Sequence, residues 1–311
     1  MRAFIFPGQG SQAVGMGKAL AEASAAAREV FQEVDEALGQ HLSVLMFDGP
    51  ADELTLTANA QPAIMANAIA TLRVLEKEGG LKLADKADYV AGHSLGEYSA
   101  LCAAGALDLA TTALLLRHRG EAMQAAVPVG VGAMAALLGA DLTIAQKIAE
   151  AAAQGEVCTV ANDNDPSQVV ISGAKAAIDR AIEIAKDYGA KRAIALPVSA
   201  PFHCPLMQPA ADAMEKALAE ARIDTPLVAV FANVTAQPVS DVDTIRKLLV
   251  EQVTGMVRWR ESVINMADTG VERFVEFGGK VLSPMVKRIV PDVDASSVIS
   301  MEDIEALAKS F

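Results

Sequence analysis

At 311 residues the chain is longer than a typical single domain and shorter than three, which favours one large domain with a smaller insert. Hydrophobic residues make up 52% of the chain and charged residues 21%, so it can bury a sizeable core and is not a disordered protein. The formal net charge of −13 excludes a general nucleic-acid binder, because phosphate contacts need clustered Lys and Arg.

The first part of the chain alternates strands with helices. The pattern predicts a buried strand at residues 2–6, a helix over 16–38, a helix from Pro62 to Gly79-Gly80, and a strand at 89–91 that enters a tight turn. A further helix is predicted over 111–124. Such alternation is typical of an α/β domain with a mainly parallel sheet.

Between residues 128 and 197 the pattern changes to the order βαββαβ, which is typical of a ferredoxin-like domain. The polar run Asn162 to Pro166 is predicted as the turn between its two middle strands. The α/β pattern then resumes. We therefore predict a large α/β-hydrolase-like domain made of residues 1–127 and 198–311, with a small ferredoxin-like domain of residues 128–197 inserted in it.

Gly92-His93-Ser94-Leu95-Gly96 matches the G-x-S-x-G pattern of a nucleophile elbow, and it lies between a predicted strand and helix as that motif requires. A serine on such a turn is projected away from the backbone. The N-terminus of the following helix favours negative charge beside it, and the Leu95 N–H is placed to donate to an oxyanion. Ser94 is therefore the candidate nucleophile, with a purely structural turn as the alternative.

A serine nucleophile needs a base, and the chain has four histidines. His41 follows a helix end, His93 points away from Ser94 if the turn is tight, and His118 lies between two arginines. His203 lies in a proline-punctuated loop at the predicted domain junction, where ligand sites concentrate. His203 is the candidate base, and a structural histidine is the alternative.

Arg119 lies on the apolar stripe of its predicted helix, because its neighbours three and four residues away are all apolar: Leu115, Leu116, Ala122 and Met123. A guanidinium that faces inward must find an anion. That anion is either an internal carboxylate or a carboxylate on the substrate, held by the fork of N–H donors. By contrast, Arg117 has Glu121 one turn on and is predicted to be solvated.

Three scattered cysteines without CxxC spacing (Cys102, Cys158 and Cys204) predict reduced core thiols and no metal site. The apolar run at residues 3–6 is too short for a signal peptide, and the uncharged stretch 122–140 is broken by Pro and Gly. We therefore expect a soluble cytoplasmic protein without a membrane span.

Several motifs occur together in a fixed order along the chain. They are Phe6 to Gln12, Gly92 to Tyr98, Arg117 to Gly120 with Met123, Asn162 with Gln168 to Gly173, Ser199 to His203, and Val257 to Trp259. This set resembles the malonyl-CoA:acyl carrier protein transacylases over essentially the whole chain. The resemblance implies a ping-pong transfer of malonyl from malonyl-CoA, through an ester on Ser94, to the phosphopantetheine thiol of acyl carrier protein, in fatty acid or polyketide synthesis. It implies no permanently bound cofactor.

The same resemblance assigns the catalytic groups. His203 would act as base and then as acid, oriented by a backbone carbonyl near Gln252. The backbone N–H groups of Gln9 and Leu95 would form the oxyanion hole.

For the substrate, the resemblance implies that Arg119 binds the malonyl carboxylate and that Phe202 crowds out branched acyl groups. Asn162 would line the pantetheine channel. The basic residues Lys280, Lys287 and Arg288 are candidates for docking the acidic carrier protein, with a solvated helix face as the alternative.

Three other functions share some of these features. A serine esterase or thioesterase shares G-x-S-x-G, although it leaves the inward Arg119 unexplained. A dinucleotide-binding domain is suggested by Gly8-x-Gly10-x-x-Ala13 with Glu33 or Asp35 beyond it, although Asp35 falls inside a predicted helix. A non-catalytic docking module would not need Ser94, His203 and Arg119 together.

Overall fold

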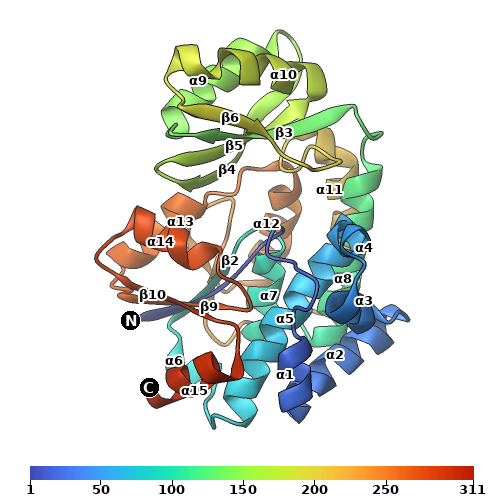
Figure 1. Ribbon diagram of the computed structural model, residues 1–311, viewed down its shortest axis with the longest axis vertical. Helices are drawn as coiled ribbons and strands as arrows, with labels where there is room; N and C mark the ends of the chain where they lie inside the picture. The colour runs from blue at the N-terminus through green and yellow to red at the C-terminus, as the bar shows by residue number, and fades with distance from the viewer.

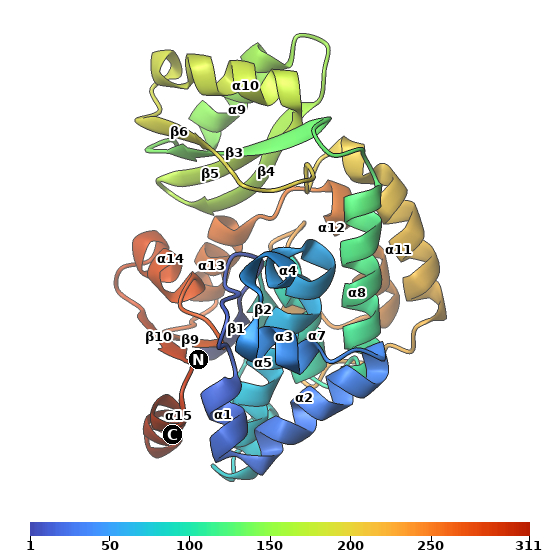
Figure 2. The ribbon, with the colours of Figure 1, turned by 45° about the vertical axis from the view of Figure 1, so that its right-hand side comes forward.

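The computed structural model describes all 311 residues, which form two sheets, each with helices packed against it (Figure 1). In Figure 2 the small sheet with α9 and α10 lies above the rest of the molecule. None of the helices has the length and hydrophobicity needed to span a bilayer.

The large sheet has six strands in the order β10-β9-β1-β2-β7-β8. All neighbouring strands are parallel except β7 and β8. The strands are β1 (Arg2–Phe6), β2 (Tyr89–Gly92), β7 (Ala229–Phe231), β8 (Pro238–Val239), β9 (Arg273–Phe277) and β10 (Asp294–Val298). This mainly parallel sheet confirms the predicted α/β class.

Helices cover both faces of the large sheet. They are α1 (Lys18–Ala23), α2 (Ala25–Leu38), α3 (Leu42–Asp48), α4 (Ala51–Thr55), α5 (Thr57–Lys77), α6 (Leu83–Lys86), α7 (Gly96–Ala103), α8 (Leu109–Ala125), the short 3-10 helix η2 (Pro205–Met207), α11 (Gln208–Glu220), α12 (Val242–Thr254), α13 (Trp259–Asp268), α14 (Leu282–Ile289) and α15 (Met301–Lys309).

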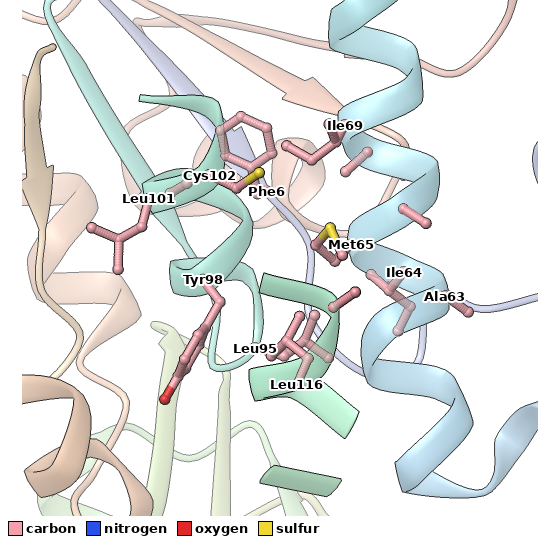
Figure 3. Packing of buried hydrophobic residues seen from close by; sticks show 14 of the residues in the cluster. Phe6, Ala63, Ile64, Met65, Ile69, Leu95, Tyr98, Leu101, Cys102 and Leu116 are labelled. Atoms are coloured by element: carbon pink, nitrogen blue, oxygen red, sulfur yellow. The ribbon is translucent and has the colours of Figure 1, made fainter. Parts of the chain in front are cut away.

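Side-chain alternation along β1 divides the core between the two faces. Phe4 and Phe6 belong to the main hydrophobic cluster with α5 and α7, whereas Ala3 and Ile5 belong to a smaller cluster with α13 and α14. Figure 3 shows Phe6 and Cys102 near Met65 and Ile69 of α5, whereas Leu101 points away from that helix. Because α7 packs between the sheet and α5, the start of this helix is held rigidly.

The small sheet has four antiparallel strands in the order β4-β5-β3-β6, which confirms the ferredoxin-like arrangement. Its elements are β3 (Gly132–Leu138), α9 (Leu142–Ala153), β4 (Cys158–Asp165), β5 (Gln168–Ala174), α10 (Lys175–Ile184), the 3-10 helix η1 (Ala185–Tyr188) and β6 (Arg192–Ala195). We propose residues 128–197 as the small domain, because all of these elements lie within that span.

The small sheet buries both of its faces. Ala135 and Leu137 of β3 pack with α9 and α10, whereas Met134 and Ala136 belong to the main cluster of the large domain. Backbone bonds also join the two parts, since Val257 N–H donates to Ala161 O at 2.8 Å and Asp163 N–H donates to Val257 O at 3.0 Å. The small sheet is therefore fastened directly to the large domain.

The turn predicted at Asn162 to Pro166 is wrong in its first four residues, which continue β4. All four side chains are buried, and three of them, those of Asp163, Asn164 and Asp165, face a partner on the large domain. Asp163 pairs with Arg260 at 2.9 Å, and Asp165 pairs with Arg288 at 2.8 Å. Tertiary pairing therefore overrides the local turn propensity.

Two predicted helix boundaries are also wrong. The helix expected over 16–38 is broken at Ser24, whose hydroxyl caps α2 by accepting from Ala27 N–H. The helix expected to begin at Pro62 begins at Thr57, so the proline lies inside α5. Packing outweighs the proline signal here, because Gly120 of α8 lies against this first turn: a Cβ on Gly120 would come within 2.7 Å of Thr57 O.

Candidate active site

The loop from β2 to α7 places Ser94 in a left-handed conformation, with φ of 55°. This sharp turn requires both flanking glycines. A Cβ on Gly92 would lie 1.8 Å from Gly96 O, and a Cβ on Gly96 would lie 2.2 Å from Phe6 O. The G-x-S-x-G spacing therefore has a steric cause at both glycines, and it projects the serine out of the turn.

His203 lies within hydrogen-bond distance of the serine. The Ser94 Oγ to His203 Nε2 distance is 2.8 Å, and His203 Nδ1 lies 2.8 Å from the backbone oxygen of Gln252. Because a carbonyl can only accept, Nδ1 carries the hydrogen and Nε2 is free to take the proton of Ser94. Burial, followed by the charge of Arg119, lowers the pKa of His203 to about 3, which keeps the imidazole neutral.

Arg119 is 1% exposed and makes no ion pair with any carboxylate of the protein. Its Nη1 donates to Gln61 Oε1 at 2.7 Å, and its Nη2 donates to Gln252 Oε1 at 2.9 Å and to Ser94 Oγ at 3.1 Å. Burial lowers the pKa of Arg119. The guanidinium is thus a buried cation, held by amides beside the serine. The Glu97 carboxyl group interacts with it electrostatically, but no carboxylate lies within ion-pair distance.

Glu97, in the first turn of α7, is a buried acid that was not predicted from the sequence as functional. Its Oε2 accepts from Asn233 N–H at 3.2 Å and from Gln252 Nε2 at 2.7 Å. Burial raises the pKa of Glu97 to about 7. A network of polar side chains therefore surrounds the Ser94–His203 pair. No Asp accepts from His203 Nδ1, as it would in the triad of an esterase.

A cavity of about 360 Å³ joins these groups. Its walls include Gln9, Ser94, Leu95, Arg119 and His203. No hydrogen bond within the protein uses the backbone N–H of Gln9 or of Leu95, so both donors are available to a ligand oxygen. The predicted nucleophile, base, guanidinium and oxyanion donors therefore share one cleft.

The other predicted substrate residues line the same cavity: Phe202 and Asn162, which are 9% and 7% exposed. A second cavity of about 520 Å³ shares Gln9, Phe202 and the 196–198 segment with the first, and it extends along Lys175 and Asp179 of α10. This larger cavity contains neither Ser94 nor His203 nor Arg119, so the smaller one is the chemical site.

The three predicted docking residues differ in their surroundings. Lys280 is exposed and precedes Val281, which lines the active-site cavity. Lys287 is exposed, and its Nζ donates to Val293 O at 2.5 Å. Arg288 is half-exposed and pairs with Asp165, so part of its role is to fasten the small sheet.

Several polar residues of the site were not predicted from the sequence. Gln61 was hidden by placing the helix start at Pro62, and Asn164, whose Oδ1 lies 2.7 Å from His93 Nε2, fell in the expected turn. Asn233 follows β7 at the carboxyl edge of the parallel sheet, a position that usually carries functional groups and could have identified it. No group of three or more His, Cys, Asp and Glu side chains is arranged to hold a metal ion.

The geometry does not favour the alternatives. Asp35, the acid required for a dinucleotide site, lies inside α2 and accepts hydrogen bonds from Ser43. The glycines at positions 8 and 10 line the Ser94 cavity instead.

Comparison with known proteins gives a consistent result. The acyl transferase domain family matches residues 3–284. The malonyl CoA-acyl carrier protein transacylase of Bacillus subtilis is 46% identical over 305 residues, covering 97% of this chain and 95% of that protein. Among solved structures, an acyl-carrier-protein S-malonyltransferase from Bartonella henselae superposes with a TM-score of 0.97 at 54% identity, covering 99% of this chain and 98% of the other.

A second solved structure holds a malonyl-transacylase in complex with a type II PKS acyl-carrier protein. It superposes with a TM-score of 0.96 at 39% identity and covers 100% of this chain and 99% of that one.

Proposed function

The chain belongs to the acyl transferase domain family, and on that premise we propose that it moves a malonyl group from malonyl-CoA to the phosphopantetheine thiol of an acyl carrier protein. The single observation that carries the malonyl preference is the environment of Arg119. A buried guanidinium with no carboxylate of the protein within ion-pair distance, 3.1 Å from Ser94 Oγ, provides a binding site for the free carboxylate of the acyl group.

In the first half-reaction, His203 Nε2 takes the Ser94 proton while Oγ attacks the thioester carbonyl carbon. The oxyanion that forms accepts from the N–H groups of Gln9 and Leu95. When the tetrahedral intermediate collapses, the C–S bond breaks, and the departing CoA sulfur takes the proton from His203. The products are free CoA and a malonyl ester on Ser94.

The second half-reaction reverses these roles. His203 takes the proton of the phosphopantetheine thiol, and the sulfur attacks the ester carbonyl. Collapse breaks the C–O bond and returns the proton to Ser94 Oγ. The acyl group and the proton are both carried by side chains of the protein, so we propose that the reaction needs no resident cofactor.

We propose supporting roles for the remaining predicted residues. The backbone carbonyl of Gln252 keeps the hydrogen of His203 on Nδ1. Phe202 lines the cavity and leaves less room for a branched acyl group, and Asn162 lines the path of the pantetheine arm.

The basic residues near the cavity, Lys280 and Lys287 with the exposed side of Arg288, are proposed to meet the acidic carrier protein. We also propose a cytoplasmic location, which is supported by three buried cysteines that form no disulfide.

The test is acyl-enzyme formation by the variant Ser94→Ala. Intact-protein mass spectrometry after brief exposure to malonyl-CoA should show a malonyl adduct on the unchanged protein and none on the variant. Ser99→Ala is the matched control, because Ser99 is buried on α7 and its hydroxyl has no hydrogen-bond partner. A malonyl adduct that persists in Ser94→Ala would remove Ser94 from the mechanism.

A further inference from the structure

Asn233 lies two residues after the end of β7 and is 1% exposed. Strand β7 pairs in parallel with β2, so the carboxyl ends of both strands meet at one edge of the sheet. Ser94 follows β2 at that same edge. Asn233 does not line the cavity, and it is therefore placed behind the nucleophile, away from the substrate.

The Asn233 side chain spans the elbow with two hydrogen bonds. Its Nδ2 donates to Gly92 O at 2.7 Å, and its Oδ1 accepts from Ser94 N–H at 2.8 Å. A backbone N–H can only donate and a carbonyl can only accept, so these partners fix the orientation of the amide. Asn233 thus ties the first residue of the turn to the nucleophile itself.

That tie counteracts backbone strain. Ser94 has φ of 55°, a region that costs free energy for a residue with a side chain and that persists only where the surroundings enforce it. If the two bonds were lost, the N–H of Ser94 would have no partner and the turn could relax. Relaxation would move Oγ away from His203 Nε2, with which it makes a hydrogen bond of 2.8 Å.

Asn233 also reaches the other catalytic groups through Gln252. The Gln252 Nε2 atom lies 3.1 Å from Asn233 Oδ1, 3.0 Å from Ser94 O and 2.7 Å from Glu97 Oε2, so its two hydrogens are shared among three acceptors. This directs Gln252 Oε1 toward Arg119, while the Gln252 backbone oxygen holds His203. The buried amide of Asn233 therefore contacts Ser94 and also Gln252, the residue that orients Arg119 and His203.

We propose that Asn233 is a positioning residue that holds the Gly92–Ser94 turn in its reactive conformation and so sets the reactivity of Ser94 Oγ. The inference rests on Ser94 being the nucleophile of the proposed function. It assigns no contact with the acyl group to Asn233.

Two rates measure this effect in purified full-length protein. One is the single-turnover acylation rate at varied malonyl-CoA concentration. The other is the rate at which phenylmethylsulfonyl fluoride, a reagent for activated serine hydroxyls, modifies Ser94. In Asn233→Ala both maximal rates should fall roughly tenfold or more, while the half-saturating malonyl-CoA concentration stays within about twofold. Acetyl transfer should fall by the same factor as malonyl transfer.

Two variants separate positioning from packing. Asn233→Leu fills the space without hydrogen bonds and should be as slow as Asn233→Ala. Asn265→Ala is the control. It also removes an amide side chain that donates to a backbone oxygen, that of Ala236 at 2.8 Å, but this bond does not involve the elbow, so both rates should stay unchanged. Thermal unfolding identifies any variant that does not fold.

Unchanged sulfonylation in folded Asn233→Ala, or rates restored in Asn233→Leu, would overturn the inference and leave the proposed function intact. If neither malonyl-CoA nor phenylmethylsulfonyl fluoride modifies Ser94 in the unchanged protein, the proposed function itself fails.

Discussion

Replacing Arg119 with alanine removes the guanidinium that faces Ser94. The group is 1% exposed, so a substrate carboxylate bound to it would also be withdrawn from water. Removing one partner of such a buried ion pair costs about 3–5 kcal/mol, because the other charge is left uncompensated. At 1.36 kcal/mol per tenfold, kcat/KM for malonyl-CoA should fall on the order of 10²–10⁴. Acetyl-CoA carries no second carboxylate, so its use should be spared or improved.

The assay is competition between malonyl-CoA and acetyl-CoA for Ser94, read from intact-protein mass spectra. Arg117→Ala is the control, because Arg117 lies two residues away on α8 but points to Asn59 and Gln40 instead of the cavity. A loss of equal size for malonyl and acetyl in Arg119→Ala would refute the reasoning, since it would show that Arg119 serves only to support the structure.

Other expectations follow from the buried titratable groups and from the surface charge. His203→Ala should slow acylation on the order of 10²–10⁴, and the unchanged enzyme should show no loss of acylation rate near pH 6.5, because burial holds the pKa of His203 at about 3. Glu97 has a pKa raised to about 7, so its folded form binds a proton more tightly than the unfolded chain, and stability is lost as pH rises from 4.5 to 7. Glu97→Gln should remove that loss: between pH 4.5 and pH 8 the free energy of unfolding of the variant should fall by roughly 3 kcal/mol less than that of the unchanged protein, as measured by urea unfolding. The same dependence of the free energy of unfolding on pH in both proteins would contradict this. Lys287→Glu should slow transfer to acyl carrier protein at low salt without slowing acylation by malonyl-CoA, and equal losses in both half-reactions would reject docking at this position.

The features that could be predicted from the sequence were those with a local cause. The elbow is visible because two glycines are sterically required around Ser94, and the inward position of Arg119 is visible because a helix imposes its period on neighbouring residues. The ferredoxin-like order of the small sheet is likewise visible in the sequence of its elements.

The features that were missed have tertiary causes. Asn162 to Asp165 contain typical turn residues, yet they extend a strand because Arg260, Arg288 and His93 provide partners from distant elements. Asn233 and Glu97 acquire their surroundings only when β7, α7 and α12 meet. No window of local sequence contains those contacts.

The separation of the reactive groups along the chain has a consequence for biosynthesis. Ser94 and His203 are 109 residues apart, and Gln252 lies 158 residues beyond Ser94. While a ribosome is still making the chain, the hydroxyl on the elbow is an ordinary alcohol, because the imidazole and the carbonyl that orients it have not yet emerged. A nascent chain therefore cannot consume CoA thioesters, and acyl-enzyme formation reports that all the dispersed segments have assembled.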